Sequence, residues 1–203
     1  MMLAPLIQAL LDSCELISQK GFSPATGGNF SVRATQDTMM ISASGKDKRK
    51  ITEHDFVVCD FNANLLSGEG KPSAEAYLHG LIYQLAPTTN CVLHTHSIAS
   101  TVLSMHKSKE MHFSFQGYEM QKVIAGIISH EDNLDLYIFD NDQNMPRLAQ
   151  AVKELWPRIH MAHGFVVRGH GLYSWGSSIF EATRHMEGLE FLFQCELAKA
   201  QIK

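Results

Sequence analysis

Cysteine is scarce in this sequence and forms no metal-binding or disulfide pattern. The four cysteines, Cys14, Cys59, Cys91 and Cys195, are widely scattered, and no two of them stand in a Cys-x-x-Cys motif. This spacing argues against both a zinc ribbon and a disulfide framework. Because unpaired cysteines are usual in a reducing compartment, we expect a cytoplasmic protein.

An excess of charge of one sign is missing, and so are long apolar runs. The formal net charge of −4 leaves no basic surplus, so we expect no nucleic-acid partner. No apolar run approaches the roughly 18 residues of a membrane span, so we expect no membrane association. The apolar residues 1–11 carry no basic segment and no cleavage-like site, which favours an amphipathic helix over a signal peptide.

What remains is the composition of a globular protein, with 45% hydrophobic and 19% charged residues in a chain of 203. We find no linker, low-complexity tract or internal repeat, and therefore predict a single domain spanning residues 1–203. Hairpin-like pairs of short strands prevail over a repeating βαβ pattern. This indicates an α/β protein with a mainly antiparallel sheet and helices packed on both faces. Helical patterns cover residues 3–17, 73–85, 97–105, 144–155 and 178–199, and strand patterns cover 29–33, 38–42, 56–61, 65–66, 92–93, 134–140 and 165–168.

Histidine is abundant, and two of the 11 histidines are separated by a single residue. His94 and His96 follow an apolar strand, so their side chains leave the same face with Cα atoms about 7 Å apart. Two imidazoles at that separation can bind one metal ion, because each needs a bond of about 2 Å. His170, between two glycines after another strand, is the predicted third ligand, and three histidines with an open position are typical of catalytic zinc. The alternative is ordinary hydrogen bonding by each of the three.

Three turns rich in small residues precede the His94 strand: residues 26–29, 42–46 and 71–73. Backbone N–H groups in such turns form concavities that bind anions, and the helix after Ser73 adds a favourable dipole. Lys46 and Lys48 can add positive charge. Together these features predict a phosphate site, although each turn taken alone also fits a plain loop.

Two acidic residues are candidates for acid–base chemistry. Glu75 lies at the start of a helix that Ser73 is predicted to cap, where the helix dipole favours a carboxylate. Glu119 has apolar and aromatic neighbours, so we expect a desolvated carboxyl group whose pKa is raised toward the range useful for catalysis. The alternative for both residues is a surface carboxylate.

Five motifs occur in a fixed order along nearly the whole chain. They are Thr-Gly-Gly-Asn-Phe-Ser (26–31), Ser-Gly-Lys (44–46), Lys-Pro-Ser-Ala-Glu (71–75), His-Thr-His-Ser (94–97) and Arg-Gly-His-Gly-Leu-Tyr-Ser-Trp-Gly (168–176). In this order they resemble the class II aldolase/adducin family. The resemblance implies a three-layer α/β/α fold with a central, mainly antiparallel sheet, assembled as a homotetramer.

The resemblance also implies a site and a substrate class. The three histidines, His94, His96 and His170, would bind one divalent ion per subunit, most often Zn²⁺. The phosphate of a small sugar-phosphate substrate would be bound by the small-residue turns, namely by Gly28, Asn29, Ser44, Gly45 and Ser73, with Lys46 beside them. Within the family the chain is most similar to dehydratases, whose acid–base position Glu119 matches. We therefore expect a metal-dependent hydro-lyase.

Two other functions stay open at this point. The first is a zinc-dependent aldolase or epimerase acting on a fuculose or ribulose phosphate, in which Glu75 beside the metal would be the base. Aldolases of the family carry a catalytic tyrosine in a C-terminal tail, whereas the last tyrosine here is Tyr173, which disfavours aldol cleavage. The second is a catalytically silent, adducin-like interaction module. Such modules lack the metal-binding histidines that this chain has.

Overall fold

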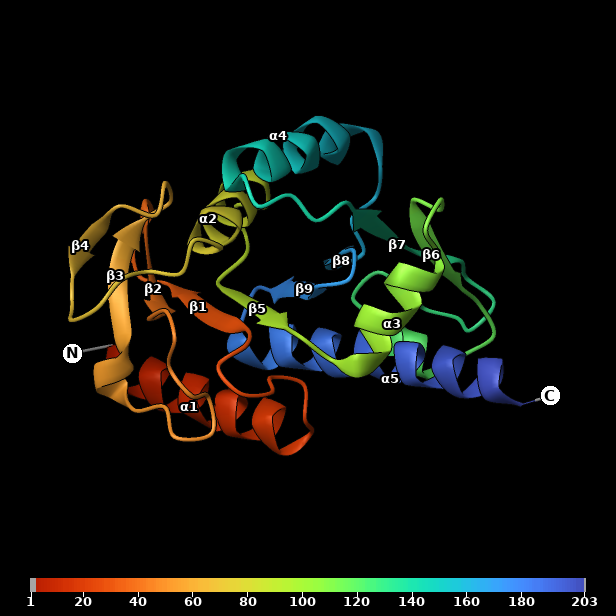
Figure 1. The fold of residues 1–203 in the computed structure, drawn as a ribbon, viewed down its shortest axis with the longest axis horizontal. Helices are drawn as coiled ribbons and strands as arrows, with labels where there is room; N and C mark the ends of the chain where they lie inside the picture. Colours follow the sequence, from red (N-terminus) through yellow and green to blue (C-terminus); the bar gives the residue numbers. More distant parts are fainter. Residues whose placement is uncertain (1–2, 203) are drawn as a thin grey trace.

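A sheet of nine strands divides the protein into three layers, as the computed structural model of residues 3–202 shows (Figure 1). The strands are β1 (Asn29–Arg33), β2 (Thr38–Ser42), β3 (Phe56–Asp60), β4 (Leu65–Ser67), β5 (Cys91–Thr95), β6 (His112–Phe115), β7 (Leu134–Phe139), β8 (Gly164–Val167) and β9 (Gly171–Gly176). The helices are α1 (Leu3–Gln19), α2 (Ala76–Leu85), α3 (Ile98–His106), α4 (Met145–Leu155) and α5 (Ile179–Gln201), with short 3₁₀ turns η1 (Glu53–Asp55), η2 (Glu119–Val123) and η3 (Trp156–Arg158). The strand order is β4-β3-β2-β1-β5-β9-β8-β7-β6. Neighbours pair antiparallel except β7 and β8, which confirms the predicted α/β fold with a mainly antiparallel sheet.

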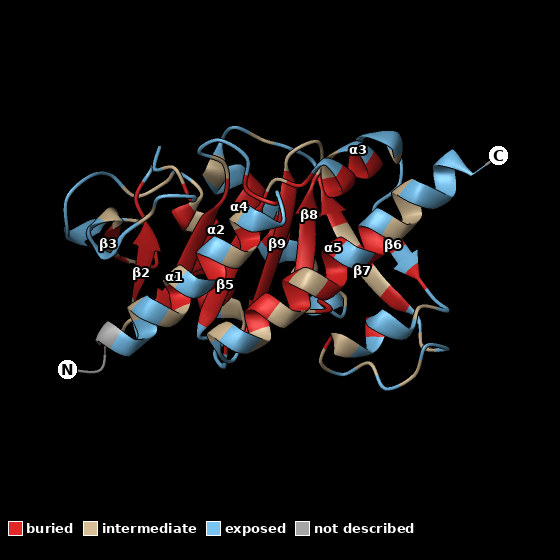
Figure 2. Cartoon of the chain, turned by 90° about the horizontal axis from the view of Figure 1, so that it is seen from below, coloured by how far each residue is buried: buried red, intermediate tan, exposed pale blue. Residues whose placement is uncertain are grey.

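Each face of the sheet has its own hydrophobic core. Helices α2 and α4 cover one face, and α1 and α5 cover the other (Figure 1). The strands are buried along most of their length between these layers, as Figure 2 shows. In β5, at the centre of the sheet, Leu93 belongs to the core under α5 and Val92 to the core under α2. Because side chains alternate along a strand, His94 faces the α2 layer and Thr95 faces α5.

Most of the predicted elements are confirmed, with two exceptions among the strands. The sequence pattern ends a strand at Arg168 and indicates none at β9, where glycines at both ends obscure the periodicity. Every residue of β9 is nevertheless buried between β5 and β8, so pairing on both sides outweighs the low strand propensity of glycine. Strand β6, within residues 107–133, is also absent from the predicted strands.

The start of α2 differs from the prediction. Ser73 does not cap α2, because the helix begins at Ala76 and its N-cap residue is Glu75, which makes no side-chain capping bond. All four cysteines are free, in line with the absence of a disulfide framework.

Among residues 3–202 there is no helix that combines the length and the apolar character needed to cross a membrane.

Candidate metal centre and anion cavity

Four side chains from separate parts of the chain meet at the C-terminal end of β5. His94 belongs to β5, His96 follows it, His170 lies in the turn between β8 and β9, and Glu75 precedes α2. One potential ligand atom from each residue lies within 4.8 Å of the other three. The structure thus brings together the three histidines selected from the sequence and adds Glu75 to them.

The distances in this cluster are short. Nε2 of His94 lies 2.8 Å from Nε2 of His96 and 3.3 Å from Nε2 of His170. Oε1 of Glu75 lies 2.8 Å from Nε2 of His170 and 3.4 Å from Nε2 of His94. Three imidazole nitrogens and one carboxylate oxygen form a donor set that a borderline divalent cation stabilises. The residues present therefore fit a metal ion.

The surroundings of His94 set its tautomer and its orientation. Its Nδ1 lies 2.9 Å from the carbonyl oxygen of Leu172, and a carbonyl can only accept, so Nδ1 carries the hydrogen. In the neutral ring the lone pair is then on Nε2, the atom that faces the cluster. The ring is fully buried and stacks on Tyr173 with centroids 4.0 Å apart. His94 is therefore preorganised as a ligand through Nε2.

The carboxylate of Glu75 is held in place by hydrogen bonds to Oε2, the oxygen that faces away from the histidines. Its Oε2 accepts hydrogen bonds from Nδ2 of Asn29 and, at 3.3 Å, from the hydroxyl of Ser73. Asn29 is itself buried in β1, next to β5. Two residues predicted to bind phosphate thus make their contacts here with the carboxylate of the cluster.

The protonation states suit metal binding. Burial raises the pKa of Glu75, but the neighbouring His94 and His170 outweigh it, so the pKa lies well below its usual range and the carboxylate is ionised. Burial, together with the other two imidazoles, lowers the pKa of His96 to about 3. A carboxylate and neutral imidazoles are the forms that ligate metals.

Glycines allow the backbone segments around the cluster to approach one another. Gly28 has a φ of +76°, and a Cβ atom on it would lie 2.5 Å from the carbonyl oxygen of His94. A Cβ atom on Gly171 would lie 1.8 Å from the carbonyl oxygen of Thr95. Both positions therefore exclude any side chain, and this close packing holds the first small-residue turn and β9 against the end of β5.

A cavity of about 250 Å³ opens beside the cluster, and Glu75 and His96 form part of its wall. The rest of the wall comes from the small-residue turns and from Lys48, which follows the second turn; the turn residues are Thr26, Gly27, Gly28, Asn29, Ala43, Ser44, Gly45 and Ser73. Five of the six residues predicted to bind phosphate therefore lie together at this cavity, and the exception is Lys46.

The positive charge at the cavity comes from Lys48. Lys48 is 2% exposed, and its Nζ donates to the carbonyl oxygens of Lys46 at 2.7 Å and Thr26 at 3.4 Å. Within residues 3–202 no carboxylate forms an ion pair with it, and burial lowers the pKa of Lys48. Lys46 instead turns away to Asp55, with Nζ 2.8 Å from a carboxylate oxygen. The structure favours Lys48 over Lys46 as the cation of an anion site.

The expected desolvation of Glu119 is wrong. Its side chain in η2 is 72% exposed and pairs with Nζ of Lys122 at 2.6 Å and with the ring of His130 at 3.7 Å. The hydrogen bond from Lys122 lowers the pKa of Glu119 rather than raising it. The apolar neighbours in sequence point elsewhere: Phe115, for example, lies in the core. Glu119 also lies outside the group of potential metal ligands found among the described residues.

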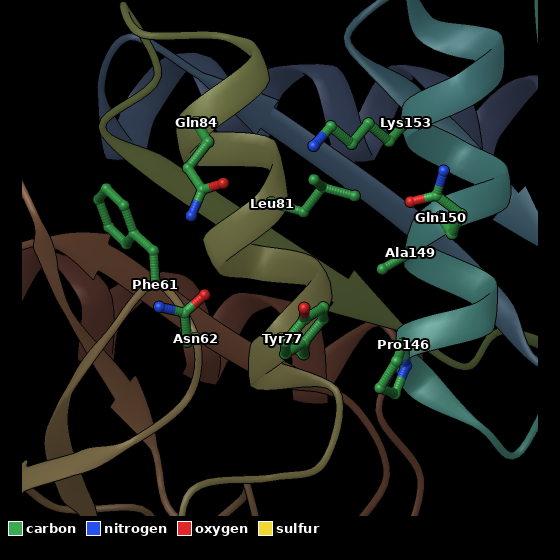
Figure 3. A pocket seen from close by; sticks show the side chains of 9 residues that line it. All are labelled: Phe61, Asn62, Tyr77, Leu81, Gln84, Pro146, Ala149, Gln150 and Lys153. Carbon is green, nitrogen blue, oxygen red and sulfur yellow. The ribbon is translucent and has the colours of Figure 1, made fainter.

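A second pocket, of about 200 Å³, lies between α2 and α4 (Figure 3). Tyr77, Leu81 and Gln84 line it from α2, and Gln150 and Lys153 line it from α4. None of the four cluster residues reaches it. We therefore assign the chemistry to the cavity beside the histidines.

Sequence patterns alone assign no role to Tyr173, on which His94 stacks. Its hydroxyl is buried without a hydrogen-bond partner among the described residues. A signal was available: Tyr173 and Trp175 are large aromatic residues two positions apart, which is the period of a strand.

The chain belongs to the class II aldolase and adducin N-terminal domain family, whose members match it over residues 8–197. More particularly, the chain is 50% identical over 192 residues to methylthioribulose-1-phosphate dehydratase of Yersinia enterocolitica, an alignment that covers 94% of this chain and 90% of that protein. It is 49% identical over 194 residues to the protein of the same name from Pectobacterium atrosepticum, covering 95% and 94%.

Solved structures agree on the fold. YgbL of Klebsiella pneumoniae superposes with a TM-score of 0.84 at 22% identity, covering 100% of this chain and 93% of that one. L-fuculose-1-phosphate aldolase of Thermus thermophilus superposes with a TM-score of 0.77 at 23% identity, covering 98% and 97%. At these identities the likeness establishes the shared architecture only.

Proposed function

We propose that this chain is a metal-dependent hydro-lyase of methionine salvage, a methylthioribulose-1-phosphate dehydratase. It would convert 5-methylthioribulose 1-phosphate to 2,3-diketo-5-methylthiopentyl 1-phosphate. The observation that carries the proposal is the shared wall of the two sites: Glu75 and His96 belong both to the ligand cluster and to the cavity that holds Lys48. The relatives that are about half identical over nearly the whole chain carry this name.

The proposed cofactor is one Zn²⁺ per subunit, held by His94, His96 and His170 with Glu75 beside them. A zinc ion supplies Lewis acidity to the ketone oxygen and the adjacent hydroxyl of the substrate, which acidifies the carbon-bound proton next to the ketone. Three imidazoles also suit other transition metals, and the carboxylate of Glu75 does not exclude them. The choice of zinc therefore rests on the family resemblance.

The phosphate end of the substrate would be held in the cavity. The Lys48 ammonium group would pair with the phosphate, and the turns at Gly28 and Gly45 would present backbone N–H groups. With the phosphate fixed there, the carbon chain extends toward the cluster, so binding energy places the reacting carbons beside Glu75.

The reaction needs one proton acceptor and one proton donor. The C–H bond next to the ketone breaks and its proton passes to a carboxylate, while the hydroxyl on the following carbon leaves with a proton as water. The resulting enol rearranges to the diketone. Glu75 is the carboxylate that lies at the site within one chain. Glu119 could act only at the site of another copy, to which its exposed side chain would be brought in the proposed homotetramer.

One observation favours a second candidate, a sugar-phosphate aldolase or epimerase. The carboxylate beside the histidines is Glu75, the base expected for that chemistry, whereas Glu119 lies elsewhere in the same chain. The candidates differ in their products: a dehydratase removes water and keeps the carbon chain whole, an aldolase divides the chain, and an epimerase inverts one carbon centre without loss of water.

Product analysis tests the proposal. The purified chain, stripped with a chelator and reloaded with Zn²⁺, is incubated with 5-methylthioribulose 1-phosphate and, separately, with fuculose and ribulose phosphates. We expect the diketone phosphate from the first substrate and only from the metal-loaded protein. Cleavage into two carbonyl fragments, or full activity after complete demetallation, would overturn the dehydratase proposal.

A further inference from the structure

A carboxyl group that the proposed mechanism does not use is buried directly behind the cluster. Glu190 of α5 is fully buried, between the core residues Leu189 and Leu192 on the same helix. No ion pair with Glu190 occurs within residues 3–202, and burial raises its pKa to about 7. A buried carboxyl group is costly unless it is hydrogen-bonded, so its contacts indicate why it is there.

Both oxygens of Glu190 are hydrogen-bonded to the segment that carries two of the cluster histidines. Oε1 accepts from the hydroxyl of Thr95 at 2.7 Å, and Oε2 accepts from the hydroxyl of Ser97 at 2.5 Å. Ser97 also caps α3, because its hydroxyl oxygen accepts from the backbone N–H of Ser100 at 3.1 Å. One carboxyl group therefore joins α5, the end of β5 and the start of α3.

These two hydroxyl residues alternate with the histidines. Along an extended segment successive side chains point to opposite faces, so His94 and His96 point to the cluster while Thr95 and Ser97 point to α5. Strand β5 ends at Thr95, and His96 lies beyond the last pair of its ladder with β9. The backbone N–H of His96 donates to the carbonyl oxygen of Phe22 at 2.7 Å. The contacts of Glu190 fix the residues on either side of His96.

We propose that Glu190 is a positioning residue for the metal centre. It holds Thr95 and Ser97 by hydrogen bonds from the α5 side of the sheet, and so sets the direction of the His96 imidazole. This inference rests on the proposed metal-binding function. Glu190 acts through these two residues and touches neither the ligands nor the substrate.

The test is metal binding by Glu190→Gln, which keeps the shape of the side chain but leaves only one oxygen to accept. The control is Glu187→Gln, three residues earlier on α5, where Glu187 is partly exposed and pairs with Lys20 at 3.2 Å. Each purified, metal-free protein is titrated with Co²⁺, whose visible spectrum reports coordination geometry, and with Zn²⁺ against a chelator. Thermal unfolding of the metal-free forms reports the structural cost separately.

We expect Glu190→Gln to bind roughly 10-fold more weakly, as is common when outer contacts of metal ligands are lost, and to show an altered Co²⁺ spectrum. Glu187→Gln should match the wild type. A folded Glu190→Gln protein with wild-type affinity and spectrum would overturn the inference alone, whereas a wild-type chain that binds no metal would overturn the metal centre and the inference with it. If Glu190→Gln does not fold, Thr95→Val removes one of the two hydrogen bonds, and unchanged binding by that variant overturns the inference.

Discussion

Replacing Lys48 by Met separates charge from shape at the proposed phosphate site. Methionine keeps a long unbranched side chain and removes only the ammonium group. Lys48 is 2% exposed, and within residues 3–202 its Nζ donates to the carbonyl oxygens of Thr26 and Lys46 and forms no ion pair, so its ammonium group is available to an anion. Lys46→Met is the matched control, because the Lys46 side chain is 45% exposed and pairs with Asp55.

The expected loss of kcat/KM on Lys48→Met follows from the burial of the Lys48 side chain. Two unit charges 4 Å apart attract by about 4 kcal/mol at the effective dielectric constant of about 20 that suits a protein. Removing one partner of a buried, hydrogen-bonded charge pair costs about 2–5 kcal/mol. Since about 1.4 kcal/mol corresponds to tenfold, Lys48→Met should lower kcat/KM at least about 30-fold. An exposed pair contributes up to about 1 kcal/mol, so Lys46→Met should stay within about fivefold of the wild type.

The assay combines steady-state kinetics on 5-methylthioribulose 1-phosphate with inhibition by inorganic phosphate. If Lys48 binds the phosphate group, Lys48→Met raises the inhibition constant for phosphate as well as lowering kcat/KM. A fall in kcat/KM with an unchanged inhibition constant would mean that Lys48 only holds the loops at Thr26 and Lys46 together. A larger effect of Lys46→Met than of Lys48→Met would refute the reasoning altogether.

Three further outcomes are expected. Gly28→Ala should lower both stability, by melting temperature, and metal content, by elemental analysis, because φ is +76° and the added Cβ would lie 2.5 Å from a carbonyl oxygen; a fully stable variant would contradict the structure there. A mixture of inactive Glu119→Gln and His94→Ala chains, refolded together, should regain activity if Glu119 serves a neighbouring subunit, and no recovery would exclude that role. His185, whose pKa burial lowers to about 4, accepts from the Ala125 N–H through Nε2, so it stabilises the fold only while neutral. The free energy of unfolding in urea should therefore fall by up to about 3 kcal/mol as the pH drops from about 6.5 to 4, and His185→Gln should flatten this dependence.

The histidine cluster could be predicted from the sequence because each of its parts carries a local signal, although the parts lie far apart along the chain. A spacing of two after an apolar strand already places His94 and His96 on one face, and the glycines around His170 mark a close backbone approach. The small-residue turns were recognisable for the same reason. Their positions at the cavity follow from the family fold, which the ordered motifs indicated.

What could not be predicted depends on the direction of side chains in the folded protein. The sequence alone does not distinguish Lys46 from Lys48 as the phosphate-binding residue. In the folded protein Lys46 pairs with Asp55 at the surface, whereas Lys48 is buried. The apolar residues around Glu119 suggested burial, yet a 3₁₀ turn sends the carboxylate into solvent. Glu190 did offer a signal, a lone acid on an otherwise apolar helix face, but its partners lie 93 and 95 residues away along the chain.

The pairing of β5 with β9 also determines when the metal site can form. His94 and His170 are 76 residues apart in sequence and meet only after β9 has docked on β5. Contacts of such high sequence separation form late, since loop closure must precede them. An unfolded chain offers the ion little beyond one His-x-His pair. Bound metal should therefore lower the unfolding rate and leave the folding rate unchanged. A nascent chain would therefore acquire its ion only after the ribosome has released the segment through β9.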